Sequence, residues 1–363
     1  MGRPGRADSH ASRKAGLIMR LFVVGPKWVG GWTESMERAA CALGHTPIVF
    51  YYDTFGVIRL QAGALGRLPM ALRSALNPVA FKAGRTWEAW MNRKLVAAVR
   101  TARPDAIIVL KGETIAGETL AALRAQRRPL VAWWVDDPFR APQAVRHFGL
   151  FDVLYMFDKG HLDELETQGA RRIVYLPCAG DHNTFRPQSL DPADYPRYTC
   201  TVGFVAAYYP GRGALLGHMR GLGVGLWGPG WDAAPELKEL PPGTWRARRI
   251  TPPEAARVYN LATICPNVHH PQTQVGGLNT RTFEVLAAGG FELVDNVAGL
   301  DENFQVGREI VAYASPAHFR ELADYYLSYP DKRAAISERG RARVLRDHTY
   351  EQRLLTILRT MPK

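Results

Sequence analysis

An arginine and a glutamate three positions apart, Arg281 and Glu284, are the residues of this sequence whose types and spacing best suit a chemical task. On a helix, residues three apart share a face, and this face lies near the helix N-terminus. The guanidinium and the helix dipole attract phosphate groups, and the carboxylate accepts hydrogen bonds from sugar hydroxyls. The pair predicts a nucleotide-sugar site; the alternative is a surface ion pair.

A second arginine follows an apolar run that is typical of a buried strand. Residues 200–205 form this run, and the glycine-rich loop predicted over residues 206–213 contains Arg212. We predict that Arg212 binds the diphosphate, because loops after strands commonly contact phosphate. Gly203 would let the backbone approach it closely. The alternatives are an ordinary loop arginine and a glycine required only for packing.

Two polar residues follow the strand predicted over residues 262–266. Asn267 and His269 come directly after it, at the end where parallel α/β sheets place their ligands. We predict that both line the sugar pocket. The alternatives are a capping asparagine and a packed histidine.

The candidates for an acceptor base are Asp136 and Asp137, which end the apolar strand pattern of residues 130–135. Adjacent strand residues point to opposite sides, so at most one carboxylate faces a cleft and the other caps the next turn. The alternative is a plain Asp-Asp-Pro turn. Lys111 and Glu113 follow another strand pattern and form either a cleft pair or a surface ion pair.

The elements that must position these residues form two consecutive patterns of alternating strands and helices. The first contains a glycine loop at residues 26–32 and a helix at 34–43 for which Thr33 is the expected N-cap. Strands are predicted at residues 20–25, 47–51, 105–110, 130–135, 153–157, 173–176, 200–205, 224–227, 262–266 and 291–294. A polar segment, residues 177–198, separates the two patterns. The sequence therefore predicts an α/β protein with two facing sheets and a hinge.

Composition and charge limit the class of protein. The chain has 363 residues, 47% of them hydrophobic, and no apolar run near the ~18 residues needed to span a bilayer. No signal peptide is recognisable, and residues 1–18 are predicted to be a disordered basic leader. The cysteines form no CxxC pair, and we expect a reduced, cytoplasmic protein without a bound metal. They are Cys41, Cys178, Cys200 and Cys265.

The net charge of +12 is unevenly distributed. Residues 54–103 contain nine basic residues and one acid, Glu88, a net charge of +8. Such a segment predicts attraction to anionic surfaces, including the inner face of a membrane. The alternative is a solvated surface. A helical face is also expected here, formed by Trp87, Trp90, Met91, Leu95, Ala98 and Val99.

A set of short motifs resembles the CgeB-type ("spore maturation protein") glycosyltransferases, which are similar to the wider GT-B group with a glycosyl-transferase-group-1 C-terminal domain. The motifs cover the C-terminal half well and the N-terminal half loosely. They are Phe204-Val205 with Arg212, residues 227–231, Tyr259-Asn260, residues 267–269, residues 281–284 and residues 348–350. Residues 176–181 with 185–187 are similar to the hinge motif of that group.

The resemblance implies two Rossmann-like domains facing a cleft. Residues 19–185 would bind the acceptor, residues 186–345 would bind the nucleotide sugar, and residues 346–363 would form a helix that crosses back. It also implies a metal-independent transferase whose donor is a nucleotide-diphosphate sugar, with uridine as the favoured base, and no permanently bound cofactor. One departure is Gly276, because many relatives have a glutamate eight positions before the residue that matches Glu284.

Two other functions remain open on the sequence alone. A GT-B-like sugar-nucleotide epimerase would use the same pyrophosphate site without an acceptor. A basic nucleic-acid-binding protein would fit the charge, but no helix-turn-helix or aromatic RNA-binding motif is present. For a transferase, the acceptor is not determined and is a glycan, a lipid-linked glycan, a protein or a small molecule.

Overall fold

The first domain is built on a sheet of six parallel strands in the order β2-β1-β3-β4-β5-β6. A computed structural model describes residues 17–27, 31–52, 70–189 and 191–362, with side chains in 70–84 excepted. The strands are β1 (Arg20–Gly25), β2 (Thr46–Tyr51), β3 (Ala106–Leu110), β4 (Leu130–Trp134), β5 (Val153–Met156) and β6 (Ile173–Tyr175). Every residue of β3 and β4 is buried, which explains their continuous apolar sequence.

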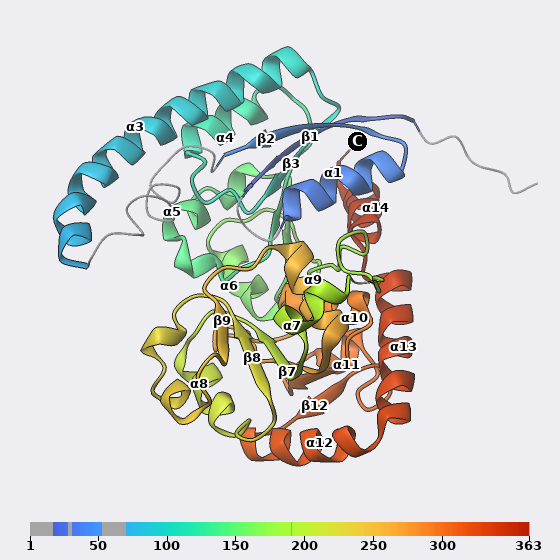
Figure 1. The fold of residues 1–363 in the computed structure, drawn as a ribbon. Helices are drawn as coiled ribbons and strands as arrows, with labels where there is room; N and C mark the ends of the chain where they lie inside the picture. Colours follow the sequence, from blue (N-terminus) through green and yellow to red (C-terminus); the bar gives the residue numbers. More distant parts are fainter. Residues whose placement is uncertain (1–16, 28–30, 53–69, 190, 363) are drawn as a thin grey trace, which may run out of the picture.

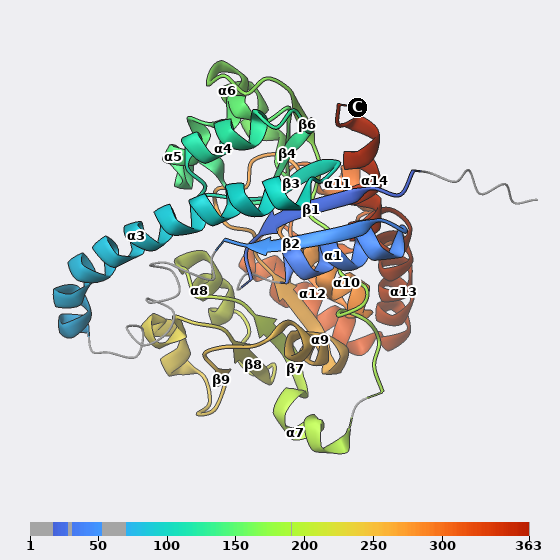
Figure 2. The ribbon, with the colours of Figure 1, turned by 90° about the horizontal axis from the view of Figure 1, so that it is seen from above.

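Helices cover both faces of this sheet (Figures 1 and 2). The main ones are α1 (Trp32–Ala42), α3 (Met70–Ala102), α4 (Gly117–Arg124) and α6 (Leu162–Thr167). The helix α3 runs alongside α4 and extends well past the sheet (Figure 2). Met91, Leu95 and Val99 attach it to the core and are fully buried.

The second domain contains another sheet of six parallel strands, in the order β12-β11-β10-β7-β8-β9. This order is that of a doubly wound dinucleotide-binding fold, and its direction of winding reverses between β7 and β10. The strands are β7 (Cys200–Val205), β8 (Val224–Trp227), β9 (Trp245–Ala247), β10 (Ala262–Asn267), β11 (Glu292–Asp295) and β12 (Val311–Tyr313). Its main helices are α8 (Pro210–Gly217), α9 (Pro252–Leu261), α10 (Thr280–Ala288), α12 (Pro316–Ser328) and α13 (Pro330–Asp347).

The last helix, α14 (Tyr350–Thr360), returns to the first domain (Figure 1). Leu354 and Ile357 are fully buried in the core cluster that contains the first strand. The Tyr155 hydroxyl of β5 donates to the Ile357 carbonyl oxygen at 3.2 Å. The predicted GT-B fold, including a C-terminal helix that crosses back, is confirmed.

The chain crosses between the domains twice, and Arg353 ties the two crossings together. Its buried guanidinium donates to the Pro177 and Cys178 carbonyl oxygens at 2.8 Å and to His348 Nδ1 at 2.8 Å. Burial and the nearby Arg353 lower the pKa of His348 to about 3. The imidazole is therefore neutral, accepts at Nδ1 and donates from Nε2 to the Asn303 carbonyl oxygen at 3.2 Å.

The ten predicted strands are all present, whereas some finer predictions are wrong. Strands β9 and β12, of three residues each, were missed. Thr33 is not an N-cap; Gly31 precedes the helix, and the buried Thr33 hydroxyl donates to the Pro26 carbonyl oxygen. Trp87 and Trp90 do not join the buried face of α3, since they are 40% and 39% exposed.

Parts of the basic segment fall outside what the structure describes. Residues 54–69 are among those not described, and the side chains of Arg73 and Lys82 are not described either. Among the described residues, no helix combines the length and apolar character that crossing a bilayer requires.

We expect Arg353→Leu to lower the free energy of unfolding by about 3 kcal/mol, because it leaves several buried carbonyl oxygens without donors. Urea unfolding measures this. Arg359→Leu is the matched control, since Arg359 is an exposed arginine of the same helix. Equal stability of the two variants would show that the crossings do not depend on Arg353.

Candidate functional site

The polar residues of the second domain gather at the carboxyl ends of β7 and β10. These strands are adjacent, and the winding of the sheet reverses between them. In doubly wound sheets, ligands bind in the crevice at this position. The loop after β7 leads to Arg212, Asn267 ends β10, and the N-terminus of α10 contributes Arg281.

Arg212 lies in the first turn of α8, and not in the loop where it was predicted. Its guanidinium donates to the Ala207 carbonyl oxygen at 2.8 Å and to the Val268 carbonyl oxygen at 3.2 Å. It also stacks on the Tyr209 ring, 4.2 Å from the centroid. Burial, and then the like charge of Arg281, lower the pKa of Arg212 to about 9. The two guanidinium groups are therefore close enough to repel each other.

Arg281 is held by Asn267. The Arg281 guanidinium donates to Asn267 Oδ1 at 2.8 Å. Asn267 is fully buried, and its amide nitrogen donates to Asn279, Thr282 and Glu292. Both the oxygen and the nitrogen of the Asn267 amide are thus hydrogen-bonded within the protein. Asn267 therefore orients Arg281 instead of facing a sugar, contrary to the prediction.

Neither guanidinium forms an ion pair within the described part of the chain, although Asp295 lies near enough to Arg212, and Glu284 to Arg281, to interact electrostatically. Arg212 and Arg281 form hydrogen bonds only to neutral oxygens there and take part in no ion pair. The Nε atoms of both are buried and have no hydrogen-bond partner. Two cations with unused, buried donors form a site that is complementary to a group with more than one negative charge.

His269 and Asp295 form a buried pair at the same edge of the sheet. His269 Nδ1 lies 2.7 Å from Asp295 Oδ1, and the His269 backbone N–H donates to both carboxylate oxygens. Nε2 of His269 is buried and has no partner among the described residues. The contact between Nδ1 and the carboxylate fixes the orientation of the ring, so that Nε2 points away from Asp295. Asp295, the last residue of β11, was not predicted.

Glu284 lies one turn after Arg281 and is partly buried. Burial raises the pKa of Glu284 to about 7, although Arg281 and a hydrogen bond from Thr280 act in the opposite direction. Its charge also contributes to raising the pKa of the buried Cys178 and Tyr350. Glu284 therefore lies close to the crossing segment, and its protonation changes near neutral pH.

A second carboxyl group, Glu292, lies beneath the arginines and was not predicted. It is 1% exposed, and its Oε1 accepts from Asn267 Nδ2 at 2.8 Å. Burial raises its pKa well above the ordinary value, which favours the protonated, uncharged form. Its position at the start of a buried strand gave no sequence signal.

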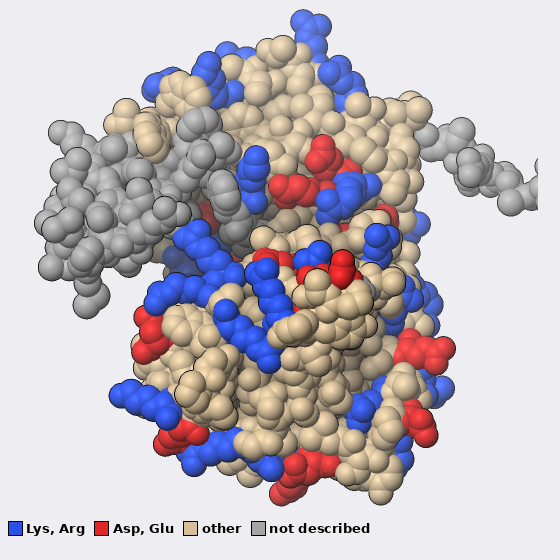
Figure 3. Space-filling view, viewed as in Figure 1, with Lys and Arg blue, Asp and Glu red and all other residues tan. Residues whose placement is uncertain are grey.

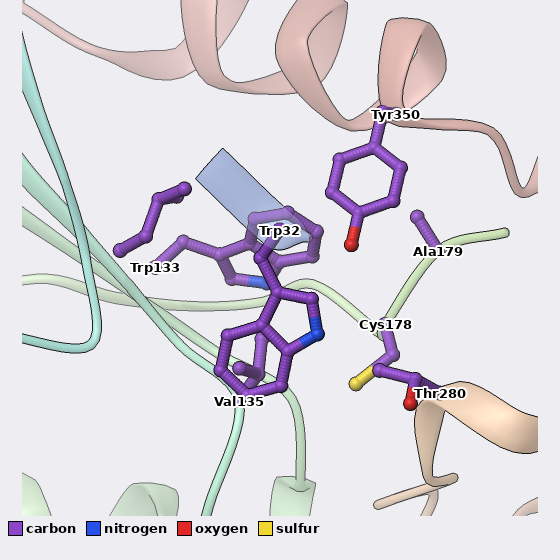
Figure 4. Close-up of a pocket in the computed structure, with 8 residues that line it drawn as sticks. Trp32, Trp133, Val135, Cys178, Ala179, Thr280 and Tyr350 are labelled. Carbon is purple, nitrogen blue, oxygen red and sulfur yellow. The ribbon is translucent and has the colours of Figure 1, made fainter. Parts of the chain in front are cut away.

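The N-terminus of α10 faces the first domain. Thr280 lines a small cavity with Trp32, Trp133, Cys178 and Tyr350, which project toward it from the first domain, the crossing segment and α14 (Figure 4). Its volume of about 10 Å³ leaves room for roughly one water molecule. The domains are therefore in close contact beside the helix that carries Arg281 and Glu284.

The structure separates the two predicted base candidates. The Asp137 carboxylate accepts from the Phe139 backbone N–H at 2.9 Å and so caps the turn of residues 138–140. Asp136 accepts from Lys111 Nζ at 2.9 Å and from Gln272 Nε2 of the second domain at 3.0 Å. Burial opposes ionisation of Asp136, but Lys111 and then Arg140 hold its pKa below the ordinary value. Asp136 is therefore the candidate with a side-chain hydrogen bond to the second domain.

Lys111 pairs with Glu113 as well, at 3.5 Å, and all three groups are partly buried. The pair of Lys111 and Glu113 is therefore partly buried beside Asp136. Among the described residues, no group of histidine, cysteine and carboxylate side chains is arranged to hold a metal ion.

The loop between β10 and α10 is fastened to the first domain by Asp158. This fully buried carboxylate accepts from the backbone N–H groups of Gln274 and Val275 at 2.7 and 2.9 Å. Next to them, Gly276 has a positive φ of 71°, and a Cβ there would lie 2.9 Å from the Tyr175 hydroxyl oxygen. A glutamate at position 276 would therefore not fit this arrangement.

Gly203 serves packing and does not line the site. It lies in the middle of β7, where a Cβ would be 2.6 Å from the Ala262 Cβ and 2.8 Å from Val258 Cγ1. The absence of a side chain lets α9 and β10 approach the strand. The prediction that Gly203 admits the diphosphate is therefore replaced by the packing alternative.

Comparison with known proteins agrees with this fold. Residues 212–359 match the family described as glycosyl transferase-like. Spore protein CgeB of Bacillus subtilis (strain 168) is 22% identical over 249 residues, which cover 64% of this chain and 74% of that protein.

Solved structures show the same architecture. A glycosyltransferase from Rickettsia africae ESF-5 superimposes with a TM-score of 0.61 at 14% identity, over 94% of this chain and 97% of that one. Anabaena Alr3699/HepE in complex with UDP-glucose gives a TM-score of 0.60 at 13% identity, over 94% and 99%. The fold is thus GT-B. The chain resembles the CgeB-type glycosyltransferases, as predicted, and sugar transfer is the class of reaction that these findings support.

Glu284 should make stability depend on pH. Because its pKa is raised in the folded state, the folded protein binds this proton more tightly than the unfolded chain. Its contribution is complete below the ordinary value of 4.5 and is lost as the pH rises through about 7. We expect Glu284→Gln, which stays neutral, to lose less stability over that interval than the wild type. Urea unfolding of both proteins at several pH values measures this, and parallel curves would contradict the desolvated position of Glu284.

Proposed function

We propose that the protein transfers a sugar from a uridine-diphosphate sugar to the hydroxyl group of an acceptor. The observation that carries this proposal is the pair of guanidinium groups, Arg212 and Arg281, at the point where the winding of the second sheet reverses. Neither cation forms an ion pair with a described carboxylate, and both have a buried Nε without a partner. A diphosphate supplies the negative charges and acceptor oxygens that fit them.

Transfer breaks the bond between the anomeric carbon and the phosphate oxygen, so negative charge develops on the departing diphosphate. Arg212, Arg281 and the N-terminus of α10 are placed to stabilise that charge. The two arginines are already oriented by carbonyl oxygens and by Asn267, so little reorganisation is needed. Because they provide the positive charge, we propose that the reaction needs no metal ion.

The remaining groups divide between donor and acceptor. In this proposal, ionised Glu284 accepts hydrogen bonds from the ribose hydroxyls, and His269 Nε2 contacts the donor beside the phosphates. Asp136 is charged at neutral pH and lies opposite Gln272 of the second domain. Asp136 therefore orients the acceptor hydroxyl, while Asp137 has a structural role at the start of the next turn.

We expect Arg212→Ala and Arg281→Ala each to lower the transfer rate by about 10²–10³-fold, because each removes a stabilising contact from the leaving group. Both should also remove the thermal shift caused by UDP. In the wild type, UDP at a hundredfold excess over its dissociation constant adds about 2.7 kcal/mol to stability. Arg308→Ala is the control, since Arg308 is an exposed arginine of the same domain.

The same experiment separates the other functions. Unfolding of both variants without ligand would assign the arginines a purely structural role. Conversion of a UDP-sugar in the absence of any acceptor would indicate an epimerase, and steeply salt-dependent binding of generic duplex without UDP binding would indicate a nucleic-acid-binding protein.

Metal independence has its own test. Because the two guanidinium groups take the place of a cation, we expect the transfer rate in excess EDTA to equal the rate with added Mg²⁺ or Mn²⁺. A loss of activity in EDTA that Mn²⁺ restores would show that the arginines are not sufficient.

A further inference from the structure

A long groove crosses the first domain between α3 and α4. Its volume is about 1440 Å³, far larger than that of the cavity at the domain contact. Both ribbon views show α3 running alongside α4 at this position (Figures 1 and 2). One wall is the outer side of α3, and the other is formed by α4 and residues 113–116.

Three arginines follow one another along the α3 wall. Arg85, Arg93 and Arg100 are separated by eight and seven residues, about two helical turns each, so they project from neighbouring positions on the helix. The Cα atoms of successive arginines are therefore roughly 11 Å apart along the helix axis. All three are exposed, and none forms a hydrogen bond or an ion pair with a described residue. They form a row of exposed cations, of which Arg85 also lies near enough to Glu88 to interact with it electrostatically.

Carboxylates lie between these cations, and they narrow the choice of ligand. Glu88 and Glu118 also line the groove. A nucleic acid or an anionic membrane presents a uniformly negative surface, which both carboxylates would repel. A glycan that carries anionic groups and free hydroxyls meets both kinds of side chain, because its anions pair with arginine and its hydroxyls donate to carboxylate.

The groove ends beside the proposed reaction site. Arg140 lines that end, and its guanidinium lies 3.4 Å from Asp136 and 3.5 Å from Gln272 of the second domain. On the face seen in Figure 3, lysine and arginine side chains gather where the two domains meet. A chain bound along α3 would therefore reach the contact between the domains.

The geometry points to an acidic glycan, a chain of sugars bearing carboxylate or phosphate groups, as the acceptor that binds in the groove between α3 and α4. This inference rests on the proposed sugar transfer and specifies its acceptor. Arg85, Arg93 and Arg100 hold the anionic groups of the chain, Glu88 and Glu118 accept from its hydroxyls, and Arg140 guides its end toward Asp136.

Binding of matched oligosaccharides tests this inference. An oligogalacturonide supplies carboxylates, a phosphomannan fragment supplies phosphates, and a maltooligosaccharide of equal length is neutral. We expect one or both acidic chains to bind the wild-type protein, with an affinity that falls as salt is added, and to speed UDP release from the donor. Which acidic chain binds identifies the anionic group. The double variant Arg93→Gln/Arg100→Gln should bind it roughly tenfold more weakly.

The control is Arg128→Gln/Arg171→Gln, which removes the same charge from two exposed arginines of this domain outside the groove. Equal weakening by both double variants, or equal binding of the neutral chain, would overturn the inference. Equally tight binding of single-stranded DNA or of phosphatidylglycerol vesicles would overturn it as well. If UDP binds but neither acidic chain does, the inference fails and the proposed function stands. If UDP does not bind, the proposed function fails, and the acceptor role fails with it.

Discussion

Two like charges held close together are the constraint on which the rest of the site depends. Arg212 and Arg281 repel each other, and burial deprives part of each guanidinium of water. Within the described part of the chain, the hydrogen bonds of the two guanidinium groups go to neutral oxygens only, namely two backbone carbonyl oxygens and the Asn267 amide oxygen. These contacts fix the arginines without cancelling their charge. An anionic ligand would relieve the repulsion as it binds, so a doubly charged group gains more than a singly charged one.

The buried network beneath the arginines preserves this positive charge. Asn267 connects Arg281 to the carboxyl group of Glu292, but burial raises the pKa of Glu292 well above its ordinary value and so favours its uncharged form. An ionised carboxylate at that position would offset the charge of Arg281. The nearby Asp295 is ionisable as well, yet His269 and its backbone N–H engage both of its oxygens. Asp295 is thus already engaged by His269 and forms no ion pair with either arginine.

The sequence predicted the parts of this arrangement that depend on local periodicity. Apolar runs located the ten longer strands, and helical spacing placed Arg281 and Glu284 one turn apart in α10. Residues whose roles arise from contacts distant in sequence were not predictable in the same way. Asn267 lies at the end of a strand and Gly203 within one, and in the sequence both positions suit a binding residue. Only the tertiary packing shows that Asn267 orients Arg281 and that Gly203 lets α9 pack closely against its strand. Asp295 could have been found, because it ends a strand at the same edge as Asn267.

The contact between the domains sets the geometry of the donor site. The loop that joins β10 to α10 carries the chain from His269 to Arg281, and Asp158 of the first domain holds that loop by two backbone N–H groups. Gly276 fits against Tyr175 only because it lacks a side chain. A movement that separates the domains would therefore release the loop between the two segments that we propose to bind the donor. The contact of Asp158 with this loop stabilises both the closed arrangement of the domains and the proposed donor site. Domain closure and nucleotide binding must therefore favour each other by the same free energy.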